Sequence, residues 1–413
     1  MNDNQSITNR IFSTAEINAF RSETKGTRNV IHLNNAGAGL MPDVVTQSQL
    51  NHIELEAEIG GYESSALRAS AIAEFYKESA LLFNCKAANI AFTASATDAY
   101  TRALSSIPFK EGDIILTDND DFVSNQIQFI SLSKRLGITI VHIANSAIGG
   151  VDLNDLEEKL KKLRPRLLAI THVPTNSGLV QPVEDIAEIF DNYLKLYDEK
   201  TWYILDACQS VGQMKLDVNK LKCDFLSATG RKFLRGPRGT GILYISDKVL
   251  NEGLEPMFID MRGAEWTTKD SYSQQLDAKR FEDWEFAYST VLGTTEALSY
   301  CRKIGEDRIW EQVKLLSGSL RNELNAIDTI RVLDKGPQLA SLVTFHVAHS
   351  NAPFIVSELL KRKINVVPSY RAFGVIDFDE KGVEWAIRVS PHYYNTFDEL
   401  EIFTESLKEI IKK

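Results

Sequence analysis

Residues 227–241 combine side chains that suggest a covalent and anionic binding site. Lys232 lies between Arg231 and Arg235 in this run, which also carries Arg238, one proline and several glycines. Glycine lets the backbone approach a ligand closely, and arginine side chains neutralise anionic groups. We therefore expect the loop to bind an anionic ligand, with Lys232 facing it.

Two other charged residues end or interrupt apolar runs. Asp206 closes the run 202–206, where a carboxylate is costly unless it pairs with a cation. The alternative is that Asp206 caps the turn that follows. Arg388 interrupts the apolar run 385–389, which favours bidentate binding of a carboxylate, although a structural ion pair would also explain it.

Further candidates come from neutral residues near strand ends. Phe122 follows the predicted strand 113–117 and is placed to stack on a ring, or else is a core aromatic residue. Ser95, Ala96 and Thr97 follow the predicted strand 90–93, where free N–H groups at a helix N-terminus bind phosphate. Small residues there would also serve close packing. Asn35 either faces a ligand or makes a turn.

Together these residues satisfy the requirements of pyridoxal 5′-phosphate (PLP). PLP needs a lysine for its aldehyde, a carboxylate for its pyridine nitrogen, donors for its phosphate and a cation for the substrate carboxylate. Gln209, three residues after Asp206, is placed to donate to the phenolate oxygen of the ring. We predict that Lys232 binds PLP covalently.

The elements around these residues alternate between strand and helix. β-Branched and leucine-rich runs separated by helical patterns predict a mostly parallel sheet covered on both faces. Ligands of such sheets lie at the carboxyl ends of the strands, where Thr171 and Asp206 fall. From about residue 297 the pattern predicts one long helix, 297–326, and then a small α+β domain. The predicted organisation is an N-terminal arm (1–30), a large PLP-binding domain (31–296) and a small C-terminal domain (297–413), with the site between the domains.

Composition narrows the class of protein. The chain has 413 residues, 44% of them hydrophobic, and a net charge of −10, which argues against nucleic acid or an anionic membrane as a partner. We predict no membrane span and no secretory signal. The four cysteines show no CxxC spacing, so we expect no zinc site, no disulfide framework and a cytoplasmic location.

Three stretches, residues 205–213, 223–232 and 236–241, resemble a known family. They are similar to the class V aminotransferase group of fold type I PLP enzymes, which includes cysteine desulfurases, selenocysteine lyase, kynureninase and isopenicillin N epimerase. The resemblance covers roughly residues 31–408, and the sequence of the three stretches is most similar to the branch containing hercynylcysteine sulfoxide lyase. It implies a PLP-dependent transferase fold of type I, an amino-acid substrate and a homodimer.

The resemblance also implies roles for individual residues. Lys232 would carry PLP, Asp206 would pair with the ring nitrogen and Arg388 would bind the substrate α-carboxylate. The implied phosphate ligands are Ser95, Ala96, Thr97, Thr229 and Arg231; the implied ring contacts are Phe122 by stacking and Gln209 at the hydroxyl. Gap-free alignment puts Thr175 at a second ring-hydroxyl contact, with Asn176 beside it, and either residue fits.

Two departures from cysteine desulfurases shape the functional prediction. Residues 366–374 lack the mobile cysteine that accepts sulfur as a persulfide in desulfurases. Residues 281–286, which include Glu285, stand where desulfurases have a segment whose threonine binds the cofactor phosphate of the neighbouring subunit. We predict a β-eliminating C–S lyase that acts on a cysteine derivative without a persulfide cysteine. An aminotransferase or an epimerase is the alternative, and a non-enzymatic protein of the same fold is a third reading. The phosphate already has its donors, so Arg235 and Arg238 have no role in binding it. We expect them to steer an acidic substrate or to bind Glu282 or Glu285.

Overall fold

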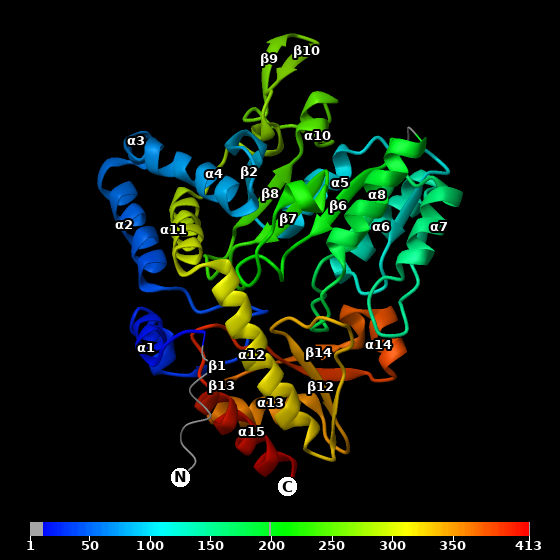
Figure 1. The fold of residues 1–413 in the computed structure, drawn as a ribbon. Helices are drawn as coiled ribbons and strands as arrows, with labels where there is room; N and C mark the ends of the chain where they lie inside the picture. Colours follow the sequence, from blue (N-terminus) through cyan, green and yellow to red (C-terminus); the bar gives the residue numbers. More distant parts are fainter. Residues whose placement is uncertain (1–10, 198–199, 413) are drawn as a thin grey trace.

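The chain forms two packed bodies, each built around one sheet (Figure 1). The computed structural model describes residues 11–197 and 200–412. The upper body in Figure 1 contains a seven-stranded sheet and the lower body a four-stranded sheet, and helix α12 (Glu306–Asn325) runs from one to the other.

The seven-stranded sheet is mostly parallel. Its strand order is β2-β8-β7-β6-β5-β3-β4, and only β8 runs antiparallel to its neighbours β2 and β7. The strands are β2 (Ile90–Thr93), β3 (Ile114–Thr117), β4 (Thr139–His142), β5 (Leu167–Thr171), β6 (Trp202–Asp206), β7 (Phe225–Thr229) and β8 (Gly241–Ile245). This order confirms the predicted fold class, and the carboxyl ends of β3, β5, β6 and β7 meet at one edge.

Helices cover both faces of this sheet. Leu205 belongs to one apolar cluster and its neighbour Ile204 to another, because successive side chains of a strand point to opposite faces. The helices of this body are α2 (Asp43–Ile59), α3 (Gly61–Leu67), α4 (Ala69–Phe83), α5 (Ala96–Ser106), α6 (Val123–Leu136), α7 (Leu153–Leu163), α8 (Val183–Tyr197), α9 (Val218–Leu221), α10 (Asp247–Asn251) and α11 (Tyr288–Ile304).

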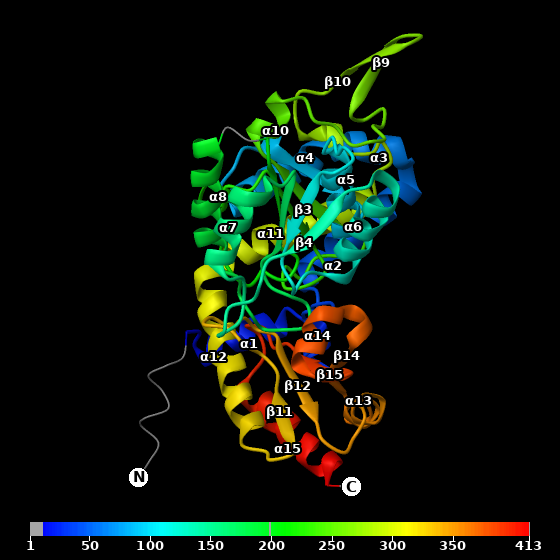
Figure 2. The same cartoon turned by 90° about the vertical axis from the view of Figure 1, so that its right-hand side faces the viewer.

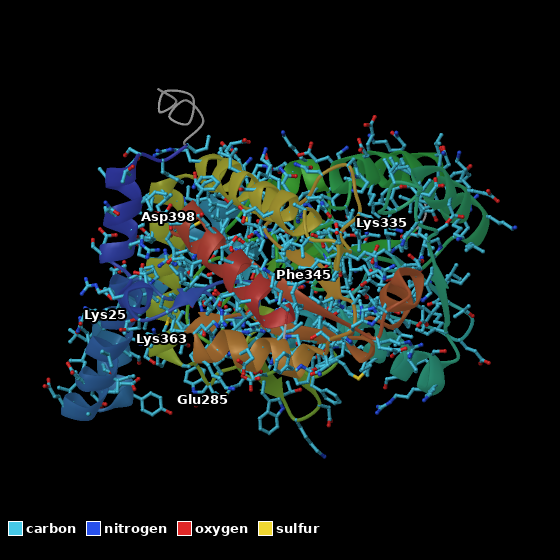
Figure 3. The ribbon with its side chains drawn as sticks, turned by 90° about the horizontal axis from the view of Figure 1, so that it is seen from below. Lys25, Glu285, Lys335, Phe345, Lys363 and Asp398 are labelled. Carbon is cyan, nitrogen blue, oxygen red and sulfur yellow. The ribbon has the colours of Figure 1, made fainter. Side chains whose placement is uncertain are left out.

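The second sheet is antiparallel, in the order β11-β12-β15-β14. Its strands are β11 (Ile330–Val332), β12 (Val343–Val347), β14 (Val367–Tyr370) and β15 (Trp385–Val389). Helices α12, α13 (Ala352–Lys361) and α15 (Phe397–Ile411) pack on it, with Phe345 of β12 in their common core (Figure 3). A shorter helix, α14 (Val375–Lys381), lies at the side of the lower body that faces the larger one (Figure 2).

The single helix predicted over residues 297–326 is wrong. Helices α11 and α12 are separated by Gly305, whose φ of 94° is incompatible with a continuous α-helix. Glycine adopts this conformation without the steric cost that a side chain would add, so the chain can change direction there.

The N-terminal part of the described chain reaches the second sheet. Helix α1 (Thr14–Ser22) is followed by β1 (Ile31–His32), which pairs in parallel with β13 (Ile364–Asn365). Leu33 is buried in the apolar cluster of the second sheet. These residues therefore associate with the smaller body, although we predicted that residue 31 begins the large domain; the domain division as a whole stays a prediction.

A two-stranded hairpin projects from the larger body (Figures 1 and 2). It consists of β9 (Ala264–Thr268) and β10 (Ser271–Gln274), and the side chain of Trp266 on it is 78% exposed. Its strands carry mostly polar residues without an apolar face, so the hairpin could not be predicted from the sequence pattern.

Candidate active site

A cavity lies at the carboxyl ends of β5, β6 and β7, beside the N-terminus of α5. Ten of the thirteen predicted site residues line it, and three further residues complete the wall. The lining residues are Ser95, Ala96, Thr97, Phe122, Thr171, Val173, Thr175, Asp206, Cys208, Gln209, Thr229, Arg231 and Lys232.

Lys232 faces this cavity from the loop after β7. Its side chain is buried, and its Nζ lies 6.0 Å from the centre of the Phe122 ring. Burial lowers the pKa of Lys232 to about 8, although the nearby Asp206 carboxylate opposes the shift. A minor part of this amine is therefore neutral at pH 7 and half of it near pH 8, and the neutral form is the one that acts as a nucleophile or a proton acceptor.

Asp206 is buried at the end of β6. Its Oδ1 accepts the N–H of Cys208 at 2.9 Å, and its Oδ2 accepts from Nδ2 of Asn125 at 3.2 Å. The carboxylate thus does cap the turn after β6, as one alternative held. Among the described residues it has no ion pair with a lysine or arginine, so its charge faces the cavity without a counter-cation.

The N-terminus of α5 forms one end of the cavity. Ser95 is the N-cap residue of α5, and its hydroxyl oxygen accepts the N–H of Asp98 at 3.0 Å. The first N–H groups of a helix have no intrahelical acceptor, so those of Ala96 and Thr97 are suited to an anionic oxygen. Thr229 and Arg231 line the same cavity, and Arg231 also donates to the carbonyl of Gly37.

Glycine is required where β8 passes this helix start. A Cβ on Gly241 would lie 2.4 Å from the carbonyl carbon of Ser95, closer than atoms can pack. The close approach keeps the Ser95–Thr97 turn against the sheet and fixes its N–H groups in direction.

Arg388 approaches the site from β15. Its Nη1 donates to the carbonyl oxygen of Thr175 at 3.0 Å and to the Thr175 hydroxyl at 2.9 Å. Its Nε is buried without a hydrogen-bond partner, and no carboxylate among the described residues pairs with it. The alternative of a structural ion pair is therefore absent from the described structure. Burial, reinforced by Arg231, lowers the pKa of Arg388 to about 10.

Thr175 also connects Arg388 to Gln209. Nε2 of Gln209 donates to the Thr175 hydroxyl at 3.0 Å and to the carbonyl of Ala36 at 3.2 Å. The Oε1 of Gln209 is buried without a partner. Of the two adjacent candidates, Thr175 is thus the one that the structure places at the cavity wall.

Asn176 and Asn35 face elsewhere, although we predicted ligand contacts for both. Oδ1 of Asn176 accepts from the hydroxyl of Ser369 at 2.5 Å, and its Nδ2 donates to the carbonyl of Phe373 at 3.0 Å. Asn35 donates to the carbonyl of Ser390 at 2.8 Å and accepts from the Tyr394 hydroxyl at 2.5 Å. Both amides are occupied by protein partners outside the cavity.

Two lining residues were missed in the sequence. Val173 belongs to the loop that carries Thr175, and Cys208 lies between the two predicted residues Asp206 and Gln209. The position of Cys208 was a usable signal. Burial and the Asp206 carboxylate raise the pKa of its thiol well above the usual value.

The predicted role of Arg235 is corrected. This side chain is fully buried and donates to the carbonyl of Leu40 at 2.7 Å, to the Thr24 hydroxyl at 2.6 Å and to the Tyr393 hydroxyl. It therefore anchors the loop of Lys232 to the N-terminal and C-terminal parts of the chain, and steers no substrate.

Among the described residues, neither acidic partner proposed for Arg235 and Arg238 forms an ion pair with them. Glu282 is buried, accepts the N–H of Phe92 at 2.9 Å and pairs with Arg262 at 3.2 Å. Glu285 and Arg238 are exposed on the surface, and Glu285 appears at the lower edge of Figure 3.

The donor set fits PLP. The cavity offers a buried amine without a carboxylate partner, a carboxylate without a cation, and helix N–H groups with an arginine beside them. An arginine with an unpaired Nε borders it. These four features are complementary to an aldehyde, a protonated ring nitrogen, a phosphate and an amino-acid carboxylate.

Comparisons with known proteins identify the family. A sequence model described as aminotransferase class-V matches residues 30–403. A probable cysteine desulfurase of Pyrococcus abyssi is 28% identical over 401 residues, which cover 95% of this chain and 97% of that protein. A second, of Methanothermobacter thermautotrophicus, is 26% identical over 93% of this chain and 95% of its own.

Solved structures agree. The apo structure of a cysteine desulfurase from Thermococcus onnurineus NA1 superposes with a TM-score of 0.85 at 26% identity, covering 96% of this chain and 98% of that one. A complex of the cystine C–S lyase C-DES with its product cysteine persulfide gives a TM-score of 0.81 at 23% identity, over 93% and 98% of the two chains, which shows the fold. The predicted family, fold type and cofactor are confirmed, whereas the narrower likeness to hercynylcysteine sulfoxide lyase stays a prediction. The chain belongs to the aminotransferase class-V family and is a PLP-dependent enzyme that acts on amino acids.

Proposed function

We propose that the enzyme is a β-eliminating C–S lyase that acts on a cysteine derivative and uses no persulfide-forming cysteine. The observation that carries this proposal is the placement of the thiols. Residues 366–374 contain no cysteine, and Cys208 is the one cysteine that lines the cavity. Its raised thiol pKa disfavours the thiolate, which is the nucleophilic form.

The other three cysteines lie in or against the apolar core. Cys223 and Cys301 are buried, Cys85 is partly buried, and burial raises the pKa of each thiol above its usual range. Sulfur transfer to an activated protein thiol therefore has no support in the described residues. Release of sulfur as a free thiol is consistent with them.

The site residues support the following division of work. Arg388 would hold the substrate α-carboxylate, and Thr175 would hold Arg388. Lys232, with its lowered pKa, would accept the α-proton, and Asp206 would stabilise a proton on the ring nitrogen. Bound PLP would supply an electron sink for the α-carbon. The thiolate then leaves from Cβ with the C–S bonding electrons, and water completes conversion to a thiol, pyruvate and ammonium.

The test is product analysis with the holoenzyme. Cysteine, cystine and S-substituted cysteines are offered without a keto acid, and pyruvate is measured. Pyruvate from wild type and from Cys208→Ala, with none from Lys232→Ala, is the expected result. Alanine as the product, or turnover only when a keto acid is added, would overturn the lyase in favour of a desulfurase or an aminotransferase.

We also propose a cytoplasmic homodimer, which the family resemblance suggests. Several large apolar side chains are exposed on one helical layer and on the region of the hairpin, among them Ile53, Leu67, Phe258, Trp266 and Leu276. No helix in the described ranges has the length and hydropathy to cross a bilayer. Sedimentation of the purified holoenzyme at twice the monomer mass is the expected result.

A further inference from the structure

One segment of the smaller body forms several hydrogen bonds with the loop that carries Thr175. This segment, residues 369–381, comprises the end of β14, a short 3-10 turn and α14. We call it the interdomain brace. It overlaps residues 366–374, the segment that lacks the mobile cysteine of the desulfurases.

Asn176 is held by three separate bonds from the brace. Its Oδ1 accepts from Ser369 Oγ at 2.5 Å, and its Nδ2 donates to the carbonyl of Phe373 at 3.0 Å. Nζ of Lys381 donates to the backbone carbonyl of Asn176 at 2.8 Å. Asn176 is 5% exposed, so these bonds are shielded from competition by water.

Lys381 is itself fixed. Its Nζ also pairs with Oδ2 of Asp377 at 2.7 Å, one helical turn away, and its side chain is only 8% exposed. Gly374 lies directly beside Asn176, because a Cβ there would meet Asn176 Nδ2 at 2.6 Å. The contact is therefore close-packed as well as hydrogen-bonded.

The hydrogen bonds to Asn176 also restrain Thr175, the preceding residue, which contacts Arg388 on the proposed substrate side of the site. Thr175 precedes Asn176, and its hydroxyl and carbonyl oxygens both accept from Arg388 Nη1. A displacement of Asn176 would move these two acceptors. Arg388 would then lose the only hydrogen bonds that orient its guanidinium in the described structure.

The same brace contacts the loop before Phe122. Asp377 faces Asp120, and Glu380 accepts from Nδ2 of Asn145 at 3.1 Å. A small cavity lies between these elements, lined in part by Asp120, Asn145, Ser177 and Lys381. The brace thus touches both loops that flank the PLP cavity.

We propose that Asn176 and Lys381 are positioning residues: they fix Thr175 and, through it, the arginine that binds the substrate carboxylate. This role differs from the cofactor contact that we predicted for Asn176, and neither residue takes part in the reaction itself. It rests on the proposed function only in that Arg388 binds an amino-acid carboxylate, and it holds for any reaction that follows.

The experiment uses the holoenzyme and L-alanine, which has the carboxylate but no leaving group at Cβ. The dissociation constant of L-alanine is obtained from the change in PLP absorbance, so the readout does not depend on lyase activity. For Lys381→Ala and Ser369→Ala we expect this constant to rise about tenfold and about threefold, while the affinity for PLP changes less than twofold. Hydrogen exchange of the peptide around residues 173–179 is expected to accelerate in both.

Three matched variants sharpen the result. Lys161→Ala removes an exposed lysine that also pairs with an acid one turn earlier, Glu157 at 2.6 Å, and should change neither readout. Lys381→Arg and Ser369→Thr retain a donor and should recover most of the affinity. If one of the variants fails to fold, the other carries the test.

The outcomes separate the two proposals. Faster exchange with unchanged L-alanine affinity would overturn the positioning role and leave the brace purely structural. Equal losses of PLP and L-alanine affinity would overturn it as well, because the whole site would then be disturbed. Absence of pyruvate formation by wild type overturns only the lyase proposal, since the L-alanine measurement is unaffected.

Discussion

The two sides of the cavity are built in different ways. On the cofactor side, Asp206, Thr229 and Lys232 lie on adjacent strands of one sheet or on the loop that leaves it, and their geometry follows from the ladder β6-β7. On the side that we propose to bind the substrate, Arg388 lies on the second sheet and donates to Thr175 on a loop of the first. The geometry of the proposed cofactor side is therefore set inside one body, whereas that of the proposed substrate side depends on how the two bodies meet.

This difference predicts which changes affect which ligand. Substitutions on the cofactor side should abolish chemistry or PLP binding. Substitutions on the substrate side should weaken amino-acid binding and leave PLP in place. Each test below either strengthens or removes that distinction.

The largest effect is expected at Lys232. Lys232→Ala would remove the proposed covalent attachment and the proposed proton acceptor, and general acid–base catalysis alone contributes roughly 10²–10⁴-fold. We expect kcat/KM to fall by at least about 10³-fold and the PLP spectrum of the resting enzyme to change. Lys222→Ala is the control, because Lys222 pairs with Asp191 on the surface. A Lys232→Ala protein with the spectrum and activity of wild type would contradict the assignment.

Arg388 should affect substrate rather than cofactor. Removing one partner of a buried charge-assisted pair costs about 2–5 kcal/mol, so Arg388→Ala should raise KM by roughly 30-fold or more. The PLP dissociation constant should stay within about threefold of wild type. Arg362→Ala, which breaks a partly exposed pair with Glu409, is the control. Loss of PLP from Arg388→Ala would show that the two sides are not separable.

The pH dependence of Lys232 tests the cofactor side in the apoprotein. Because its pKa is lowered to about 8, the neutral amine increases as pH rises and is the main form above about pH 9. Acylation of Lys232, followed by mass spectrometry, should therefore reach half its maximal rate near pH 8. An exposed lysine should still gain reactivity beyond pH 10. A Lys232 profile that matches the exposed lysines would contradict the lowered pKa.

The smallest effect is expected where the two bodies meet, at Asp120. Burial and the facing Asp377 raise its pKa to about 7, against the opposing charge of Lys381, while Glu380 adds to the shift. The folded state then retains a proton that the unfolded state loses above about pH 4, so this contribution to stability falls as pH rises from about 4 to about 7. Asp120→Asn should gain stability relative to wild type more at pH 8 than at pH 5, by about 1 kcal/mol, as measured by denaturant unfolding. An equal difference at both pH values would argue against this protonation.

Most of the cofactor side could be predicted from the sequence, because local patterns determine it. Asp206 ends an apolar strand, Ser95 begins a helix, and Lys232 follows the next strand, so the edge of a parallel sheet brings them together.

The substrate side was harder to predict, because its geometry depends on long-range contacts. Alignment could not choose between Thr175 and Asn176, since the choice depends on Ser369, which lies 193 residues further along the chain. The burial of Arg235 likewise depends on Thr24 and Tyr393, which are distant in sequence. Neither set of long-range contacts can be predicted from a local sequence pattern.

The parallel pair β1–β13 has a consequence for how the protein is made. His32 and Asn365 are 333 residues apart, so the early strand emerges from the ribosome long before its partner exists. Closing so long a loop is entropically costly and slow, and Leu33 remains exposed until it happens. During synthesis the seven-stranded sheet can assemble first, whereas β1 stays unpaired until the last quarter of the chain, which contains β13, has been made. A fragment that begins at residue 297 would lack this strand and would leave an apolar gap in its own core.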